Sequence, residues 1–171
     1  MSLIAPADQQ RLRDAFGELT RKVRLLFFTQ TLGCETCLQT RQILDELPPL
    51  SDRISIEEVN FILEPDKARQ YGIDRVPAIA VVYEDTDAND DTEAKRAGEV
   101  PEERVSGGGA PGVVKDSRIR FLGTPAGYEF VSLIQAVVLA GGRESTLSPR
   151  SRERLAAVAT PVTLRVFTTP T

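Results

Sequence analysis

The sequence contains no histidine, and this absence excludes several common kinds of catalytic site. Serine and cysteine nucleophiles that depend on a histidine base are ruled out, as are most zinc active sites. The longest apolar run, around residues 134–140, is far shorter than the roughly 20 residues of a membrane-spanning helix. No basic cluster is interleaved with aromatic residues, so nucleic-acid binding has little support.

The N-terminus also lacks a targeting signal. Residues 1–16, MSLIAPADQQRLRDAF, have no basic stretch followed by an apolar core, so no signal peptide is predicted. We therefore expect a cytoplasmic protein without a membrane segment. Disulfides are rare in that compartment, so a close cysteine pair there is more often catalytic or metal-binding than structural.

Charge is distributed unevenly along the 171 residues, a length that suits one domain or a domain plus an appendage. Glu84 to Asp116 holds ten acids and four bases, a net charge of −6, while the whole chain carries −4. The same stretch has few large apolar side chains and contains a GGGAPG tract, so it cannot form a core of its own. We predict that residues 84–117 are an acidic flexible insertion in a hairpin loop. The alternative is a short ordered extension of both flanking strands.

Cys34 and Cys37 are the only cysteines, and they form the motif CETC. They directly follow a predicted strand, which places Cys34 at the N-terminal edge of the next helix. Unpaired N–H groups and the positive end of the helix dipole favour a thiolate there. Cys37 lies one turn later, within disulfide reach and in a more buried position. We therefore predict that Cys34 is the attacking nucleophile and Cys37 the resolving thiol.

Three other interpretations of the pair remain open. A tetrahedral zinc site needs four ligands, so these two cysteines would require a second copy of the chain or carboxylates. A structural disulfide would close a very small loop and add little stability. The two thiols could also be incidental. We favour redox chemistry without metal or organic cofactor, in which Glu35, between the cysteines, modestly raises the pKa of Cys34.

Hydrophobic periodicity predicts helices and strands in an order typical of an α/β protein. Helices are expected over 7–19, through the cysteine segment to Pro48, over 64–72, over 124–142 and from Ser148 to Val158. Strands are expected over 22–29, 53–62, 76–83 and 117–123. In the cysteine helix, the predicted apolar residues are Leu38, Ile43, Leu44 and Leu47. This order predicts a four-stranded mixed sheet with helices on both faces.

The stretch VPAIAVVY places Pro77 at the entrance of a predicted strand. Alone, such a proline is usually an ordinary trans strand boundary. Together with the upstream CxxC, it suggests a cis proline that faces the cysteines. Val76 would then offer its backbone to an extended substrate as an added strand.

The N-terminal helix, CETC, YGIDRVPA, FLGTPAGYEF and the closing VTLRVFTTPT occur in that order. This set resembles the glutaredoxin-like protein disulfide oxidoreductases, which fuse two thioredoxin-fold units that each carry a CxxC. The resemblance covers nearly the whole chain outside the acidic insertion. It implies a thioredoxin-like fold with an extra N-terminal helix, Cys34 and Cys37 as the redox pair, and Pro77 as the cis proline.

The same resemblance implies a division of the chain. Residues 1–145 are expected to form a thioredoxin-like redox domain, 146–160 a linker helix, and 161–171 the first strand of a second unit. In the family, the segment matching VFTTPT leads into a second CxxC, whereas this sequence stops at Thr171. We expect residues 162–168 to add to a sheet edge, pair with another molecule or fray.

Three functions follow from these features. The leading hypothesis is a thiol–disulfide oxidoreductase acting on protein disulfides, with a thioredoxin-reductase-like protein as the candidate electron donor. The second is a redox-silent binding module that uses the fold and the acidic loop as an interaction surface. The third is an electron-relay domain serving a peroxidase or flavoprotein. The pKa of Cys34 separates the first two, because a binding module has no need of an ionised thiol.

Overall fold

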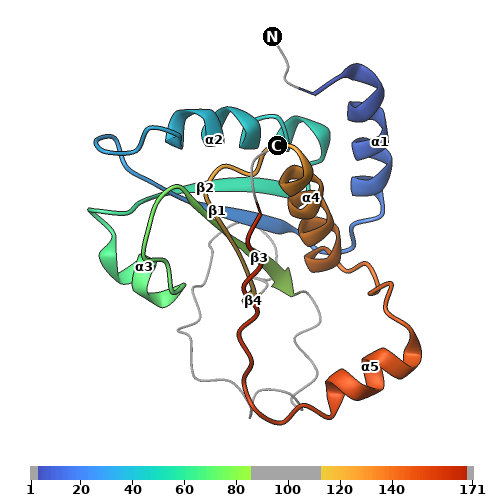
Figure 1. Ribbon diagram of the computed structural model, residues 1–171. Helices are drawn as coiled ribbons and strands as arrows, with labels where there is room; N and C mark the ends of the chain where they lie inside the picture. The colour runs from blue at the N-terminus through green and yellow to red at the C-terminus, as the bar shows by residue number, and fades with distance from the viewer. Residues whose placement is uncertain (1–3, 86–112, 169–171) are drawn as a thin grey trace.

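A computed structural model describes residues 4–85 and 113–168, and it shows a mixed sheet with helices on both faces (Figure 1). The helices are α1 (Pro6–Gly17), α2 (Cys37–Leu44), the 3-10 helix η1 (Pro48–Leu50), α3 (Pro65–Gln70), α4 (Tyr128–Ala140) and α5 (Pro149–Ala156). The strands are β1 (Val23–Thr29), β2 (Ile54–Asn60), β3 (Ala78–Asp85) and β4 (Val113–Leu122). The sheet has the order β2-β1-β3-β4, with β1 parallel to β2 and the other pairs antiparallel. The predicted sheet is confirmed.

Strand β1 is the central, buried strand that its apolar sequence predicts. It pairs with β2 on one side, starting at Val23 opposite Ile54, and with β3 on the other. Successive side chains of a strand point to opposite faces of the sheet. Leu25 and Phe27 accordingly join one buried cluster, while Leu26 and Phe28 join another.

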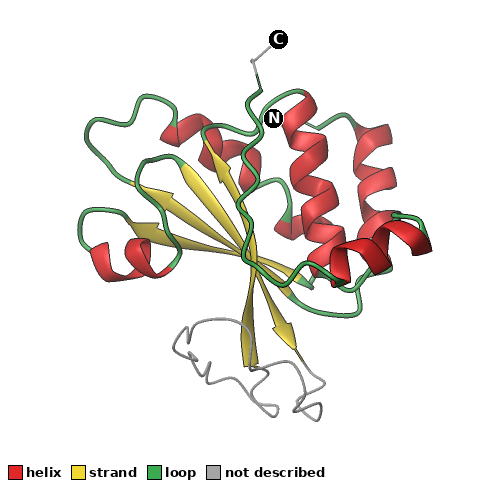
Figure 2. Ribbon diagram, turned by 60° about the horizontal axis from the view of Figure 1, so that its bottom comes forward, coloured by secondary structure: helices red, strands yellow, loops and turns green. Residues whose placement is uncertain are grey.

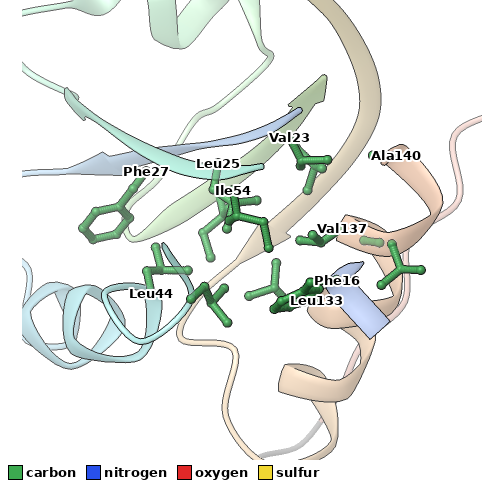
Figure 3. Close-up of a cluster of buried hydrophobic side chains, with 14 of the residues drawn as sticks. Phe16, Val23, Leu25, Phe27, Leu44, Ile54, Leu133, Val137 and Ala140 are labelled. Atoms are coloured by element: carbon green, nitrogen blue, oxygen red, sulfur yellow. The ribbon is translucent and has the colours of Figure 1, made fainter. Parts of the chain in front are cut away.

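The larger cluster lies between the sheet and three helices, α1, α2 and α4 (Figures 2 and 3). Phe16 of α1, Leu44 of α2 and Leu133 of α4 are all fully buried in it. The apolar faces predicted for the first and fourth of these helices, α1 and α4, therefore pack inward. This cluster also contains Cys37, so the candidate redox pair is built directly on the main core.

The smaller cluster lies on the opposite face of the sheet, beneath the short helix α3 (Figure 2). Ala68 of α3 and Tyr71 just after it pack on Leu26 and Phe28 of β1. The rings of Phe28 and Tyr71 lie 6.1 Å apart, centroid to centroid. Gly72 follows with a φ of 65°, the left-handed conformation that ends the helix as predicted.

Helix α2 differs from its prediction in the side that it buries. It begins at Cys37 and buries Cys37, Thr40 and Leu44. Leu38, predicted to face the core, is 71% exposed. A step of one residue turns the direction of a side chain by about 100° on a helix. The burial of Cys37 therefore carries Leu38 out of the apolar face, and the prediction for Leu38 is wrong.

The hairpin of β3 and β4 is longer than predicted. Strand β3 extends to Asp85 and β4 begins at Val113, with these two residues paired at the end of the ladder. Residues 84–85 and 113–117, assigned to the insertion from the sequence, are therefore strand. Residues 86–112 lie outside the described residues, and their mobility stays a prediction.

After α4, the chain continues into α5, where Ser148 caps the helix as predicted by accepting a hydrogen bond from the Ser151 N–H at 3.2 Å. Residues 159–168 then run back across the molecule as an exposed segment without strand pairing (Figures 1 and 2). Near its end, Thr168 Oγ1 donates to Glu129 Oε2 of α4 at 3.5 Å. That residues 161–171 begin a second unit stays a prediction.

No helix among the described residues has the length and apolar character needed to cross a membrane.

Candidate active site

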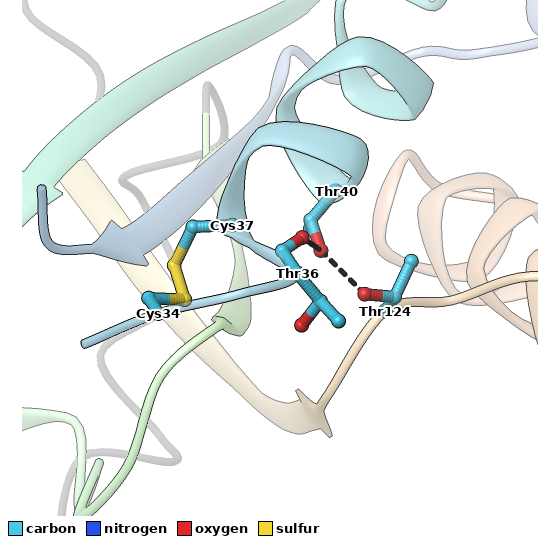
Figure 4. The surroundings of a disulfide bond; sticks show 5 residues. All are labelled: Cys34, Thr36, Cys37, Thr40 and Thr124. Carbon is cyan, nitrogen blue, oxygen red and sulfur yellow. Dashed lines mark hydrogen bonds between the residues drawn. A yellow bond between two sulfur atoms is a disulfide. The ribbon is translucent and has the colours of Figure 1, made fainter. Parts of the chain in front are cut away.

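Cys34 and Cys37 are joined by a disulfide in the turn between β1 and α2 (Figure 4). Their Cα atoms lie 5.5 Å apart. Cys34 is partly exposed and packs on the main core, whereas Cys37 is 6% exposed and belongs to it. The two sulfurs therefore differ in access: a reagent in solution meets Cys34 first.

The start of α2 places these sulfurs at a helix N-terminus. Cys37 is the first helical residue and Thr36 its N-cap, so Cys34 lies ahead of the helix rather than inside its edge. The disulfide nevertheless holds the sulfur of Cys34 beside the first helical residue. Both sulfurs are thus positioned where unpaired N–H groups and the helix dipole favour negative charge.

Thr40, one turn into α2, stabilises this helix start. The Thr36 side chain forms no capping hydrogen bond. Instead, the carbonyl of Thr36 accepts hydrogen bonds from both the N–H and the Oγ1 of Thr40, each at 2.9 Å. The hydroxyl of Thr40 is also 2.8 Å from that of Thr124, in the segment between β4 and α4 (Figure 4).

The Val76–Pro77 peptide bond is cis, as predicted. Val76 packs on the same core cluster that contains Cys37 and supports Cys34. The carbonyl of Pro77 accepts a hydrogen bond from the Gly123 N–H at 2.8 Å. The structure therefore gathers the predicted Val76–Pro77 segment and both cysteines around one end of the main core.

Charged groups at the rim of this site lie mainly on the side of Val76. The Asp74 carboxylate accepts a hydrogen bond from Arg75 Nε at 2.7 Å, and this bond holds the pKa of Asp74 below its usual range. The same hydrogen bond raises the pKa of Arg75. Glu35 is exposed between the cysteines, as is the apolar Leu32, at 84%. The rim thus combines a local ion pair with exposed apolar surface.

Sequence reasoning missed Thr40 and Thr124. One signal was present: Thr40 falls three residues after Cys37 and four before Leu44, on the face of α2 that is otherwise buried and apolar. A polar residue on such a face needs a partner. Nothing local in the sequence identifies that partner, because Thr124 lies 84 residues away.

Elsewhere in residues 4–85 and 113–168, no three or more histidine, cysteine, aspartate or glutamate side chains gather in a way that could hold a metal ion.

No protein-family model matches the sequence, and no curated relative matches it. Solved structures do match. The NTD_N/C domain of alkylhydroperoxide reductase AhpF from Enterococcus faecalis superposes with a TM-score of 0.66 at 25% identity, as does a structure of that subunit carrying a C503A mutation. A protein disulfide oxidoreductase from Aeropyrum pernix superposes with a TM-score of 0.62 at 19% identity.

Each of these matches covers 90% of the chain. The chain in turn spans 60% of the length of the two AhpF structures and 54% of the disulfide oxidoreductase. The fold is therefore thioredoxin-like, as the sequence resemblance implied. A CxxC disulfide at the start of α2 in this fold supports thiol–disulfide exchange as the general chemistry.

Proposed function

We propose that this protein is a thiol–disulfide oxidoreductase that exchanges the Cys34–Cys37 couple with disulfides of other proteins. The observation that carries the proposal is the unequal access of the two bonded sulfurs at the start of α2, with Cys34 partly exposed and Cys37 buried. An exposed thiolate can attack a substrate, while a buried neighbour is kept from doing so.

In the reducing direction, the thiolate of Cys34 attacks one sulfur of a substrate disulfide. An S–S bond forms between Cys34 and the substrate, and the other substrate sulfur leaves as a thiolate that takes up a proton. Cys37 then loses its proton and attacks the sulfur of Cys34, which releases the second substrate thiol. The substrate gains two electrons and two protons, and the Cys34–Cys37 disulfide holds the oxidising equivalents.

Val76 is the proposed docking point for the substrate backbone. Within the described ranges, the backbone N–H and C=O of Val76 form no hydrogen bond with other residues. An extended substrate segment can pair with these groups as an added strand, which brings its disulfide toward Cys34. The exposed side chains of Leu32 and Leu38 add apolar contact area on the side of the cysteines.

The cycle needs a partner that returns electrons to the disulfide. A thioredoxin-reductase-like protein, which passes electrons to a dithiol pair, is the proposed donor, and the cytoplasm is the proposed location. Neither metal nor organic cofactor takes part in the exchange itself, because each step is an attack of sulfur on sulfur.

A second candidate is suggested by the match to AhpF, which the comparison describes as a subunit of an alkylhydroperoxide reductase. In this alternative, the couple relays electrons between a flavoprotein and a peroxidase. The chemistry at Cys34 and Cys37 is the same, and only the partner proteins differ.

The test measures which disulfides the reduced protein can reduce. We expect the purified chain to catalyse insulin reduction by dithiothreitol, with a rate that depends on Cys34. Rapid reduction of an oxidised peroxidase, with insulin left intact, would instead support the relay. A Cys34 thiol that stays protonated at pH 7, with neither activity, would leave the redox-silent binding module.

A further inference from the structure

We propose that Thr40 and Thr124 are positioning residues that set the redox equilibrium of the Cys34–Cys37 couple. This inference rests on the redox function proposed above. Neither hydroxyl touches the sulfurs, and both act through the backbone of residue 36 and through the segment that follows β4.

The first part of the argument is the direction of the hydrogen bonds. Thr40 Oγ1 donates its proton to the carbonyl of Thr36 at 2.9 Å. Its contact with Thr124 Oγ1, at 2.8 Å, is then a bond in which Thr124 donates. The two hydroxyls form a short chain that ends on the peptide between Thr36 and Cys37 (Figure 4). Thr40 is fully buried, so water cannot substitute for these bonds.

The second part is the connection to the other side of the site. Gly123, the residue before Thr124, donates its N–H to the carbonyl of Pro77 at 2.8 Å. Gly123 and Thr124 therefore contact both the segment that carries Val76 and the helix that carries Cys37. This two-residue segment fixes the dithiol relative to the proposed docking backbone.

The third part is the effect on the redox equilibrium. In the oxidised form, the S–S bond already restrains residues 34–37. In the reduced form that covalent restraint is gone, and the Thr36–Thr40–Thr124 chain is what holds the first turn of α2 in place. Loss of this chain lets the reduced segment sample more conformations, and this gain in entropy favours the dithiol. The two thiols also meet less often, so the disulfide forms less readily.

The experiment measures the equilibrium constant of the couple in glutathione redox buffers, with the oxidised fraction determined by thiol trapping and mass spectrometry. We expect Thr40→Val to shift the equilibrium toward the dithiol by about three- to tenfold, which corresponds to about 14 to 30 mV. Thr124→Val should shift it less, because Thr40 still bonds to Thr36. Thr40→Ser, which keeps the hydroxyl, should restore the wild-type value.

Thr20→Val is the matched control. The hydroxyl of Thr20 donates to the carbonyl of Gly141 at 3.2 Å, ahead of β1 and away from the cysteines, which follow this strand. This variant loses a similar bond and should keep the wild-type equilibrium. The double variant Thr40→Val/Thr124→Val should match Thr40→Val alone, since the two hydroxyls belong to one chain.

The outcomes are distinguishable. A wild-type couple that cycles in the buffer while Thr40→Val and Thr124→Val leave it unchanged overturns the positioning role alone. So does a shift for Thr20→Val as large as that for Thr40→Val, because the effect would then be a general loss of stability. A wild-type pair that glutathione cannot cycle overturns the proposed function as well.

Discussion

Cys37 is 6% exposed, while Cys34, to which it is bonded, remains partly open to solvent. This difference between two sulfurs that share one bond assigns different chemistry to each when the bond is reduced. The buried thiol is harder to ionise and harder to reach, whereas the exposed one lies at a helix start that stabilises a thiolate.

Cys34→Ser should abolish catalysed insulin reduction, because no accessible nucleophile remains. Cys37→Ser should instead accumulate mixed disulfides with substrate, because the second attack is missing. Non-reducing electrophoresis and mass spectrometry of the trapped species check both results. In the reduced wild-type protein, Cys34 should react with iodoacetamide much faster than Cys37, and equal rates near pH 7 would contradict the assigned roles.

Glu35 provides a second prediction because its side chain is exposed between the cysteines. A carboxylate there opposes ionisation of the neighbouring thiol, although solvent screens part of the effect. Glu35→Gln should therefore lower the pKa of Cys34, which the pH dependence of alkylation measures. Glu18→Gln, at an exposed position after α1, is the control. A pKa that is unchanged or raised in Glu35→Gln would show that this carboxylate does not tune the thiol.

How much of the molecule the sequence predicts depends on whether the signal is local. The buried strand β1, the turn at Gly72 and the Ser148 cap each follow from a few neighbouring residues, and all three occur. The exposure of Leu38 was missed because it depends on the helix phase, and that phase is set by which side of Cys37 meets the core.

The remaining differences arise from contacts between distant parts of the chain. Residues 113–117 share an acidic, glycine-rich neighbourhood, and their strand character appears only when they pair with β3. Thr40 and Thr124 each look unremarkable alone and become informative once the fold brings their hydroxyls together. The candidate cysteines were easy to find for the opposite reason, since their two-residue spacing is a local signal.

A third prediction concerns the pH dependence of stability. Glu57 of β2 accepts a hydrogen bond from Arg24 Nη1 at 3.0 Å and another from Lys67 of α3. Burial alone would raise the pKa of Glu57, but the hydrogen bonds and charges of Lys67 and Arg24 outweigh it and lower the pKa from 4.5. A lowered folded-state pKa means that this stabilisation is complete above about pH 4.5 and is lost as the pH falls through the folded value.

Glu57→Gln should therefore cost about 1 kcal/mol of unfolding free energy at pH 7. The difference from wild type should shrink at pH 3, where Glu57 is increasingly protonated in both states. Urea denaturation at the two pH values measures this. Asp66→Asn removes a fully exposed ion pair with Arg69 and should change stability little at either pH. An equal loss for Glu57→Gln at both pH values would mean that the charge of Glu57 is not what stabilises the fold.

The last prediction separates the hairpin from the insertion that it carries. Asp85 is 8% exposed, and its carboxylate pairs with Lys115 Nζ at 2.6 Å, a contact that raises the pKa of Lys115. Val114 packs on the smaller core cluster. These residues belong to the fold, although the sequence groups them with the acidic stretch.

Two deletions test this boundary. Replacing residues 86–112 with Asn-Gly leaves Asp85 and Val113 to close a two-residue hairpin, so the melting temperature should stay within about 2 °C of wild type. Replacing residues 85–116 with the same turn removes the buried ion pair and the packing of Val114. The melting temperature should then fall by roughly 5 °C or more. Equal losses for both deletions would show that residues 86–112 pack on the core, and equal tolerance would show that the outer ladder of β3 and β4 contributes no stability.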